Sequence, residues 1–250
     1  MRRLGPTVTV PLLDYQLVLQ IERSTHDFLV FEAMASDGYY ERSTTLLLMK
    51  ELRTGQVFID VGANNGYYTL LASSRVGPTG RVIALEPNPD SFDRLMKNLS
   101  FNRITNVTSF DCGAGDSEGS TPLYIHPFED GRSSSFIRST RQVLMRTVPL
   151  DGLAEARDAD VVKIDVEGGE AAVLRGMAGL INSRHRPKFV VEWNRELGQT
   201  GDLWEVLMRY NFSVYEIRLA SGGDAAELRP ILKPEELPDI CNLWCVKPDT

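Results

Sequence analysis

Cysteine is scarce in this chain, and the few cysteines lack the spacing of a metal site. The 250 residues include three, at Cys112, Cys241 and Cys245. An odd number argues against a disulfide framework. Cys241 and Cys245 fall in an apolar segment, where we read them as small side chains of a buried strand. This usage is typical of a reducing compartment, so we expect a cytoplasmic protein.

The chain also lacks an excess of positive charge and any long apolar run. It has 27 Lys and Arg against 34 Asp and Glu, a formal net charge of −7. Proteins that bind nucleic acids usually carry a basic surface, so we expect no nucleic-acid partner. The one local group of arginines, Arg138, Arg141 and Arg146, is read as a solvated face. No stretch is apolar for long enough to span a bilayer, and no signal-peptide core follows the basic N-terminus, so no membrane insertion is expected.

A third absence concerns the glycine turn at residues 62–66. The apolar run Val57–Val61 reads as a buried strand that enters a helix through this turn, as in a nucleotide-binding βα unit. A dinucleotide site needs a second glycine so that backbone amides can close on a pyrophosphate, but Asn64 stands there. Asp60 at the strand end would repel a diphosphate and suits a cation. The turn therefore favours an adenosine compound with a positive charge and no phosphate, of which S-adenosylmethionine is the obvious one.

From Val57 onward, apolar strands alternate with helices that have an apolar face, which predicts a parallel sheet with helices on both sides. Asn88 is expected to cap a helix that begins at Pro89. The last two strands are expected to pair antiparallel. The predicted fold is thus α/β, a seven-stranded doubly wound sheet with strands near residues 57–61, 81–86, 106–111, 161–165, 188–192, 212–219 and 240–246.

Two segments depart from this alternation. Residues 7–36 alternate apolar and polar side chains, which predicts short strands in a β extension before the main sheet. Between residues 113 and 150, turn residues surround short extended pieces, which predicts a β-hairpin or loop insertion before the fourth core strand. We therefore expect a single domain at residues 41–250, preceded by an N-terminal β extension at residues 1–40 that could serve as an interface in a homo-oligomer.

Acidic residues end five consecutive predicted strands, at the sheet edge where ligands of such folds bind. Carboxylates are costly near a core unless something pairs with them, and a cationic ligand with hydroxyls would do so. Glu86 can accept hydrogen bonds from two ribose hydroxyls. Gly62 and Gly66 allow close backbone approach. Asp60 either contacts the amino-acid part of the ligand, as Asn64 does, or orients the loop. The expected cofactor-binding residues are Asp60, Gly62, Asn64, Gly66, Glu86, Pro87, Asp111 and Gly113.

Three motifs together resemble the FkbM-type S-adenosylmethionine-dependent methyltransferases. They are Phe-Ile-Asp-Val-Gly-Ala-Asn-Asn-Gly-Tyr-Tyr-Thr at 58–69, Ala-Leu-Glu-Pro-Asn-Pro at 84–89 and Val-Lys-Ile-Asp-Val-Glu-Gly-Gly-Glu at 162–170. The first is general to class I methyltransferases, and the third is more specific. The resemblance covers about residues 40–220. It implies a class I methyltransferase Rossmann-like fold and O-methylation of a hydroxyl on a natural product or saccharide.

Methylation of a hydroxyl benefits from a base within hydrogen-bond reach. Asp165 and Glu167, which follow the fourth core strand, are the leading candidates, and Glu192 is next, with Asn194 as an orienting group. His126 in the insertion is either a further base or a surface residue. The three acids could instead hold magnesium. No metal-binding motif is recognisable, however, and the family resembled is generally metal-free, so no metal is expected.

Three alternatives stay open at this level. One is a non-catalytic binding module that kept the fold and lost activity, although the intact loop, Glu86 and the motif at 162–170 argue against decay. An NAD-dependent oxidoreductase has a similar first βα unit, although the missing glycine and Asp60 count against it. A methyltransferase could also act on a peptide or a nucleic acid, because substrate choice often resides in the parts outside the resemblance.

Overall fold

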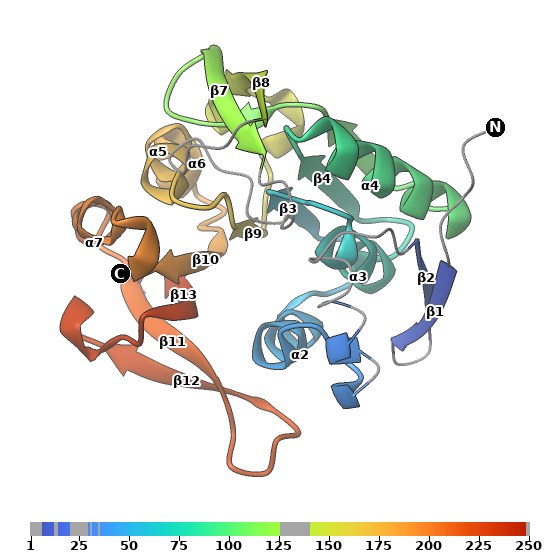
Figure 1. Ribbon diagram of the computed structural model, residues 1–250. Coiled ribbons are helices and arrows are strands. Elements are labelled where there is room, and N and C mark those ends of the chain that lie inside the picture. Colours follow the sequence, from blue (N-terminus) through green and yellow to red (C-terminus); the bar gives the residue numbers. More distant parts are fainter. Residues whose placement is uncertain are drawn as a thin grey trace.

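The computed structural model describes residues 7–12, 15–20, 30, 32–34, 36–125 and 141–248. One mixed sheet forms its centre (Figure 1). In spatial order its strands are β12 (Ala226–Ile231), β11 (Ser213–Leu219), β13 (Ile240–Val246), β10 (Lys188–Asn194), β9 (Val161–Ile164), β3 (Val57–Val61), β4 (Arg81–Leu85) and β5 (Val107–Phe110). The five strands from β10 to β5 are parallel, and β13, β11 and β12 pair antiparallel.

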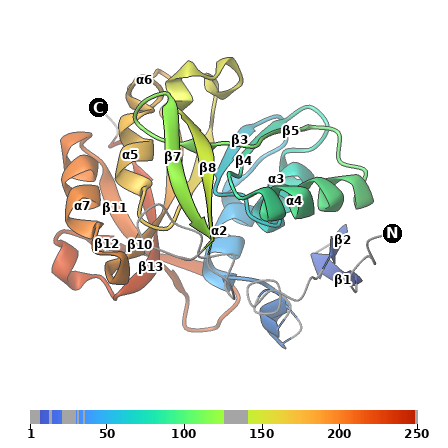
Figure 2. The ribbon, with the colours of Figure 1, turned by 45° about the horizontal axis from the view of Figure 1, so that its top comes forward.

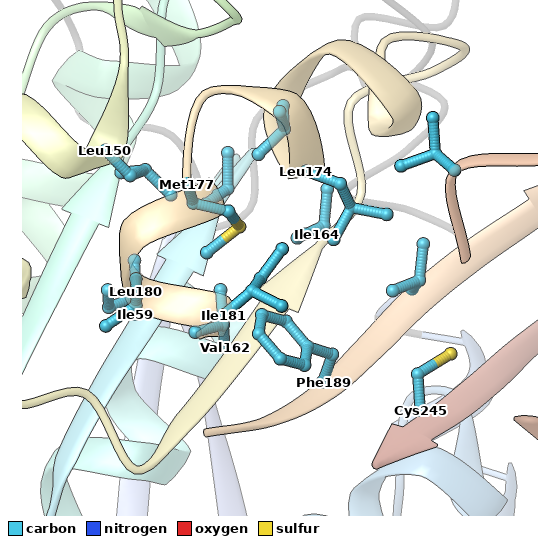
Figure 3. Packing of buried hydrophobic residues seen from close by; sticks show 14 of the residues in the cluster. Ile59, Leu150, Val162, Ile164, Leu174, Met177, Leu180, Ile181, Phe189 and Cys245 are labelled. Carbon is cyan, nitrogen blue, oxygen red and sulfur yellow. The ribbon is translucent and has the colours of Figure 1, made fainter. Parts of the chain in front are cut away.

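Helices cover both faces of this sheet, because its buried strands alternate their side chains between two apolar clusters. In β3, for example, Ile59 belongs to one cluster and Phe58 to the other. The cluster that contains Phe58 is covered by α2 (Arg42–Glu51), α3 (Tyr67–Val76) and α4 (Pro89–Phe101). The cluster that contains Ile59 is covered by α5 (Glu170–Arg175), α6 (Ala178–Ile181) and α7 (Thr200–Arg209). Figure 3 shows Leu174, Leu180 and Ile181 packed over Ile164 and Phe189. The doubly wound arrangement is confirmed.

Local capping signals act as the sequence indicates. The side chain of Asn88 accepts a hydrogen bond from the backbone N–H of Asp90, and Pro89 begins α4. Short 3₁₀ segments occur at Leu150–Gly152, Ala154–Ala156, Arg195–Leu197 and Pro234–Glu236. No described helix has the length and apolar character needed to cross a membrane. The three cysteines form no disulfide.

The sheet has eight strands, so the prediction of seven was one short. The additional strand is β12, which lies in the connection that was expected to be a proline-rich loop. Pro230 lies within it, opposite Tyr215 of β11. Proline removes one backbone donor, and an edge strand tolerates that loss because its outer side has no partner. Pro230 therefore indicates that β12 is an edge strand, and it does not end the strand.

The N-terminal extension is partly stranded and partly helical. β1 (Thr7–Leu12) and β2 (Tyr15–Gln20) form an antiparallel pair beside α3 and α4 (Figure 1). Val30 and residues 32–34 and 36–37 are helical, so the prediction of strands up to residue 36 was wrong there. Val30 and Met34, four residues apart, are both buried, which is the spacing of one helix face.

The insertion before the fourth core strand, predicted as a β-hairpin or a loop, is a small separate sheet of three strands. β7 (Gly119–Ile125) pairs antiparallel with β8 (Arg141–Val148), and β6 (Gly113–Ala114) adds in parallel to β8. Figure 2 shows β7 and β8 lying across the ends of the central strands. Arg141 and Arg146 of β8 are exposed and pair with Asp90 and Glu118. This agrees with a solvated face, and Arg138 lies outside the described residues.

Candidate active site

A cavity of about 460 Å³ lies at the carboxyl ends of β3, β4, β9 and β10, under the small sheet. Strand β3 stands between β4 and β9, so the chain leaves it first in one direction and later in the other. Such a switch point opens a crevice between the diverging connections. The volume falls in the range of roughly 300–1,000 Å³ typical of small-molecule sites.

The glycine turn after β3 forms one wall and is held tightly against β9. Gly62 has a φ of 81°, and a Cβ on it would lie 1.8 Å from the carbonyl oxygen of Asp165. Only glycine fits at that contact. Gly66, with a φ of 91°, begins α3, and a Cβ there would lie 2.6 Å from Leu95 of α4. Gly62 lines the cavity, whereas Gly66 is not among the described lining residues and serves helix packing.

Glu86 faces the cavity directly after β4, and two backbone amides fix its position. Its Oε2 accepts a hydrogen bond of 2.7 Å from the backbone N–H of Asn64, and Oε1 accepts one of 2.7 Å from Asn88. Burial raises the pKa of this carboxyl to about 7. Each oxygen keeps a further lone pair, so the group can receive a pair of neighbouring hydroxyls.

The remaining predicted cofactor residues divide into two groups. Asn64, Pro87 and Gly113 line the cavity beside Glu86. Asp60 and Asp111 do not appear in its wall. Asp111 is exposed. Asp60 is fully buried, and its Oδ2 accepts a hydrogen bond of 2.6 Å from Thr69 of α3. This placement favours the alternative in which Asp60 orients the loop.

A cluster of acids forms the opposite wall. Asp165, Glu167 and Glu192 each line the cavity, and their nearest oxygens all lie within 4.8 Å of one another. The structure therefore brings together the three carboxyls predicted as bases. Burial, followed by the charges of Asp165 and Glu167, raises the pKa of Glu192 well above its usual range. His126 lies outside the described residues.

A buried lysine, Lys163, is ion-paired with one of these acids. It is 2% exposed, and its Nζ lies 2.8 Å from Oδ2 of Asp165 and 4.7 Å from the ring centre of Tyr68. Burial alone would lower the pKa of this lysine, but Asp165, Asp60 and Glu41 outweigh it, so the pKa is raised and the ammonium persists. Within the acidic cluster, Asp165 is thus directly ion-paired with a buried cation.

The same lysine bears on the question of a metal. Three carboxylates this close could hold a divalent cation with hard oxygen ligands. Here Lys163 already supplies a positive charge to Asp165. The expectation of a metal-free site thus has a physical basis, and it stays a prediction.

Sequence reasoning missed Glu41, which lies in the cavity wall at the start of α2. Its Oε2 accepts hydrogen bonds from the hydroxyl of Tyr68, at 2.7 Å, and from Nδ2 of Asn242, at 3.0 Å. Burial, then the charge of Asp165, raises its pKa. No pattern in the sequence pointed to it, since it follows no strand. Lys163 did carry a signal, because a lysine inside the apolar run of a core strand is rarely buried without a partner.

The small sheet supplies a less polar wall. Thr121, Leu123, Met145 and Thr147 of β7 and β8 line the cavity opposite the strand ends. A purine ring requires such a surface on at least one face. The cavity thus combines a diol-binding carboxyl, an apolar wall and an acidic end with one fixed cation.

Comparison with known proteins connects these features to a family. The family model described as "Methyltransferase FkbM domain" matches residues 60–214. The chain is similar to hexuronic acid methyltransferase AglP of Haloferax volcanii, with 32% identity over 146 residues, covering 57% of this chain and 59% of that protein. It is also similar to 31-O-demethyl-FK506 methyltransferase FkbM of Streptomyces tacrolimicus, with 28% identity over 200 residues, covering 66% of this chain and 75% of the relative.

A solved structure agrees on the fold. Methyltransferase FkbM from Methylobacillus flagellatus superimposes with a TM-score of 0.54 and 18% identity, over 88% of this chain and 53% of the other. At 18% identity this structural likeness establishes the fold alone.

The sequence alignments span less than two thirds of the length of several relatives, and 59% in the case of AglP.

Proposed function

The chain belongs to the FkbM methyltransferase family, and we propose that it transfers a methyl group from S-adenosylmethionine to a hydroxyl of a small-molecule natural product or a saccharide. Glu86 carries the proposal, as a buried carboxyl held by two loop amides and facing the cavity. Its position suits the ribose diol of an adenosine. The relatives named for a hexuronic acid and for 31-O-demethyl-FK506 support the acceptor class.

The residues present fit this donor. Glu86 would bind the ribose, the small sheet would cover the adenine, and the turn at Gly62 would lie against the amino-acid end. When bound, the donor would supply an electrophilic methyl on a sulfonium, and the acidic wall would attract that positive charge. The loop amide of Asn64 is already bonded to Glu86, so it is not free to bind a diphosphate. This argues against the oxidoreductase alternative.

The acidic end would supply the base. Oδ2 of Asp165 accepts from Lys163, which leaves Oδ1 to take the proton of the acceptor hydroxyl. Loss of that proton would leave the hydroxyl oxygen free to take the methyl that the donor supplies, with S-adenosylhomocysteine as the departing product. The ion pair with Lys163 would hold Asp165 in position. Burial and the charges of Asp165 and Glu167 raise the pKa of Glu192 well above its usual range, which makes Asp165 the first choice of base.

Thermal-shift titration tests the donor. S-adenosylhomocysteine is expected to raise the melting temperature of the full chain, and NAD is expected to leave it unchanged. The variant Glu86→Ala should lose most of that shift, whereas Glu205→Gln, an exposed acid on α7, should retain it. A shift with NAD and none with S-adenosylhomocysteine would overturn the proposal.

A further inference from the structure

The cavity described above adjoins a second, more open groove, and Glu41 and Glu192 lie at their boundary. Both carboxyls line the cavity described above, and both also line a more open groove of about 660 Å³. This groove lies where α2 meets the C-terminal strands β11 and β13, and α2 contacts β11 directly. The same part of the sheet is seen beside α2 in Figure 1. A molecule in the groove would therefore have one end at the acidic wall of the cavity.

Each of the two shared carboxyls has an oxygen that receives no hydrogen bond from the described residues. The hydrogen bonds that Glu41 receives from these residues both fall on Oε2, which leaves Oε1 available to a ligand. Oε2 of Glu192 is buried and accepts no hydrogen bond from the part of the chain that the structure describes. A buried acceptor without a donor is costly, and a ligand hydroxyl would remove that cost. Glu41 also has a φ of 42°, a left-handed conformation that non-glycine residues keep mainly at functional sites.

The charges of the groove indicate what it can bind. It contains two guanidinium groups, and each lies close to an acid of the same groove. Arg42 lies 2.6 Å from Asp37, and Arg218 lies 3.9 Å from Glu216. Glu216 also lies 2.6 Å from Arg229. The acids of the described wall, Asp37, Glu41, Glu192 and Glu216, outnumber its two arginines, so the groove disfavours a carboxylate or a phosphate. Nε of Arg42 is nevertheless buried without an acceptor among the described residues, so the wall offers an unused donor as well as unused acceptors.

A hydroxyl both donates and accepts, which matches such a wall without requiring net charge. We propose that this groove binds the acceptor, and that the acceptor is a neutral, polyhydroxylated molecule whose reacting hydroxyl lies beside Glu41 and Glu192. This inference rests on the proposed methyl transfer. It makes Glu41 a binding residue for the acceptor. It also places the donor in the cavity and the acceptor in the adjoining groove.

Saturation-transfer NMR on the full chain saturated with S-adenosylhomocysteine tests the proposal, with methyl α-glucopyranoside and sodium glucuronate as probes. The neutral glucoside is expected to bind, and the anion to bind more weakly. The variant Ile240→Trp places a large ring in the groove from a side chain that is 49% exposed. It should weaken binding of the glucoside roughly tenfold or more. Leu232→Trp, at a position 82% exposed and outside the groove, should leave binding unchanged.

Each other result counts against the proposal. Binding of neither sugar, preference for glucuronate, or equal binding by Ile240→Trp and Leu232→Trp would overturn it. The thermal shift with S-adenosylhomocysteine is measured on every variant. If that shift is absent from the unsubstituted chain, the proposed function fails; if it is present while the sugar results are contrary, only the acceptor groove fails.

Discussion

At the scale of single residues, Gly62 has no room for a side chain. A methyl group there would lie 1.8 Å from the carbonyl oxygen of Asp165, which follows β9, at a φ that other residues rarely adopt. Gly62→Ala is expected to destabilise the fold by about 2 kcal/mol or more and to abolish the thermal shift with S-adenosylhomocysteine. Denaturant titration and thermal shift measure the two effects.

Gly201→Ala is the matched control for that substitution. Gly201 lies in α7, where an added methyl group would meet nothing within 4 Å, so alanine should be neutral or stabilise by about 0.5–1 kcal/mol. If the two variants unfold at the same denaturant concentration, the close contact at Gly62 does not affect the free energy of unfolding.

Buried carboxyls predict a pH dependence of stability. Burial raises the pKa of Glu86 and of Glu170 to about 7, from the ordinary value of 4.5. The folded state therefore binds more protons than the unfolded state between these values, and stability falls as pH rises through that window. For the ligand-free chain we expect Glu170→Gln to remove part of this fall, on the order of a few kcal/mol. Glu170 does not line the cavity, which keeps the test separate from ligand binding.

Urea titrations at about pH 5 and about pH 8 measure that dependence. Glu205→Gln changes the same functional group on an exposed position of α7 and should leave the slope with pH unaltered. A slope that is identical in the Glu170→Gln and unsubstituted chains would show that this carboxyl titrates normally.

At the scale of elements, strand β12 is the main departure from what the sequence indicates. Ile231 at its end is 5% exposed and packs in the larger apolar cluster, whereas Leu232 beside it is 82% exposed. Ile231→Ala is expected to cost about 2–4 kcal/mol of unfolding free energy, and Leu232→Ala less than about 0.5 kcal/mol. Denaturant unfolding compares the two. Equal losses would mean that β12 is not part of the cooperative sheet.

Elements with a strong period could be predicted because their own pattern decides them. Strands β3, β4, β9 and β10 are short, mostly buried apolar runs, and α4 has both a cap at Asn88 and an apolar stripe. β12 could not be recognised in this way. Its residues, Ala-Glu-Leu-Arg-Pro-Ile, are mostly half-exposed, and pairing with β11 holds them extended. That pairing is a tertiary contact, which a local pattern does not encode.

At the scale of the whole molecule, the site is assembled from segments far apart in the chain. Glu41, Lys163 and Asn242 meet around the acidic wall through hydrogen bonds and charge. The fixed ammonium there leads us to expect no metal requirement. Excess magnesium should not raise the melting temperature, and EDTA should not reduce the thermal shift with S-adenosylhomocysteine. Loss of that shift with EDTA and its recovery with magnesium would reverse this assignment.

The sequence by itself determined the α/β class, the glycine turn, the position of Glu86 and the choice of a cationic adenosine ligand. Those features depend on neighbours in the chain: strand, turn and helix follow one another, and the ligand edge follows from parallel strands. Only the tertiary structure decided that Asp60 lies beneath the cavity, that Lys163 pairs with Asp165, and that Glu41 joins the site. The reason is that burial and charge pairing depend on which strands and helices become neighbours in space.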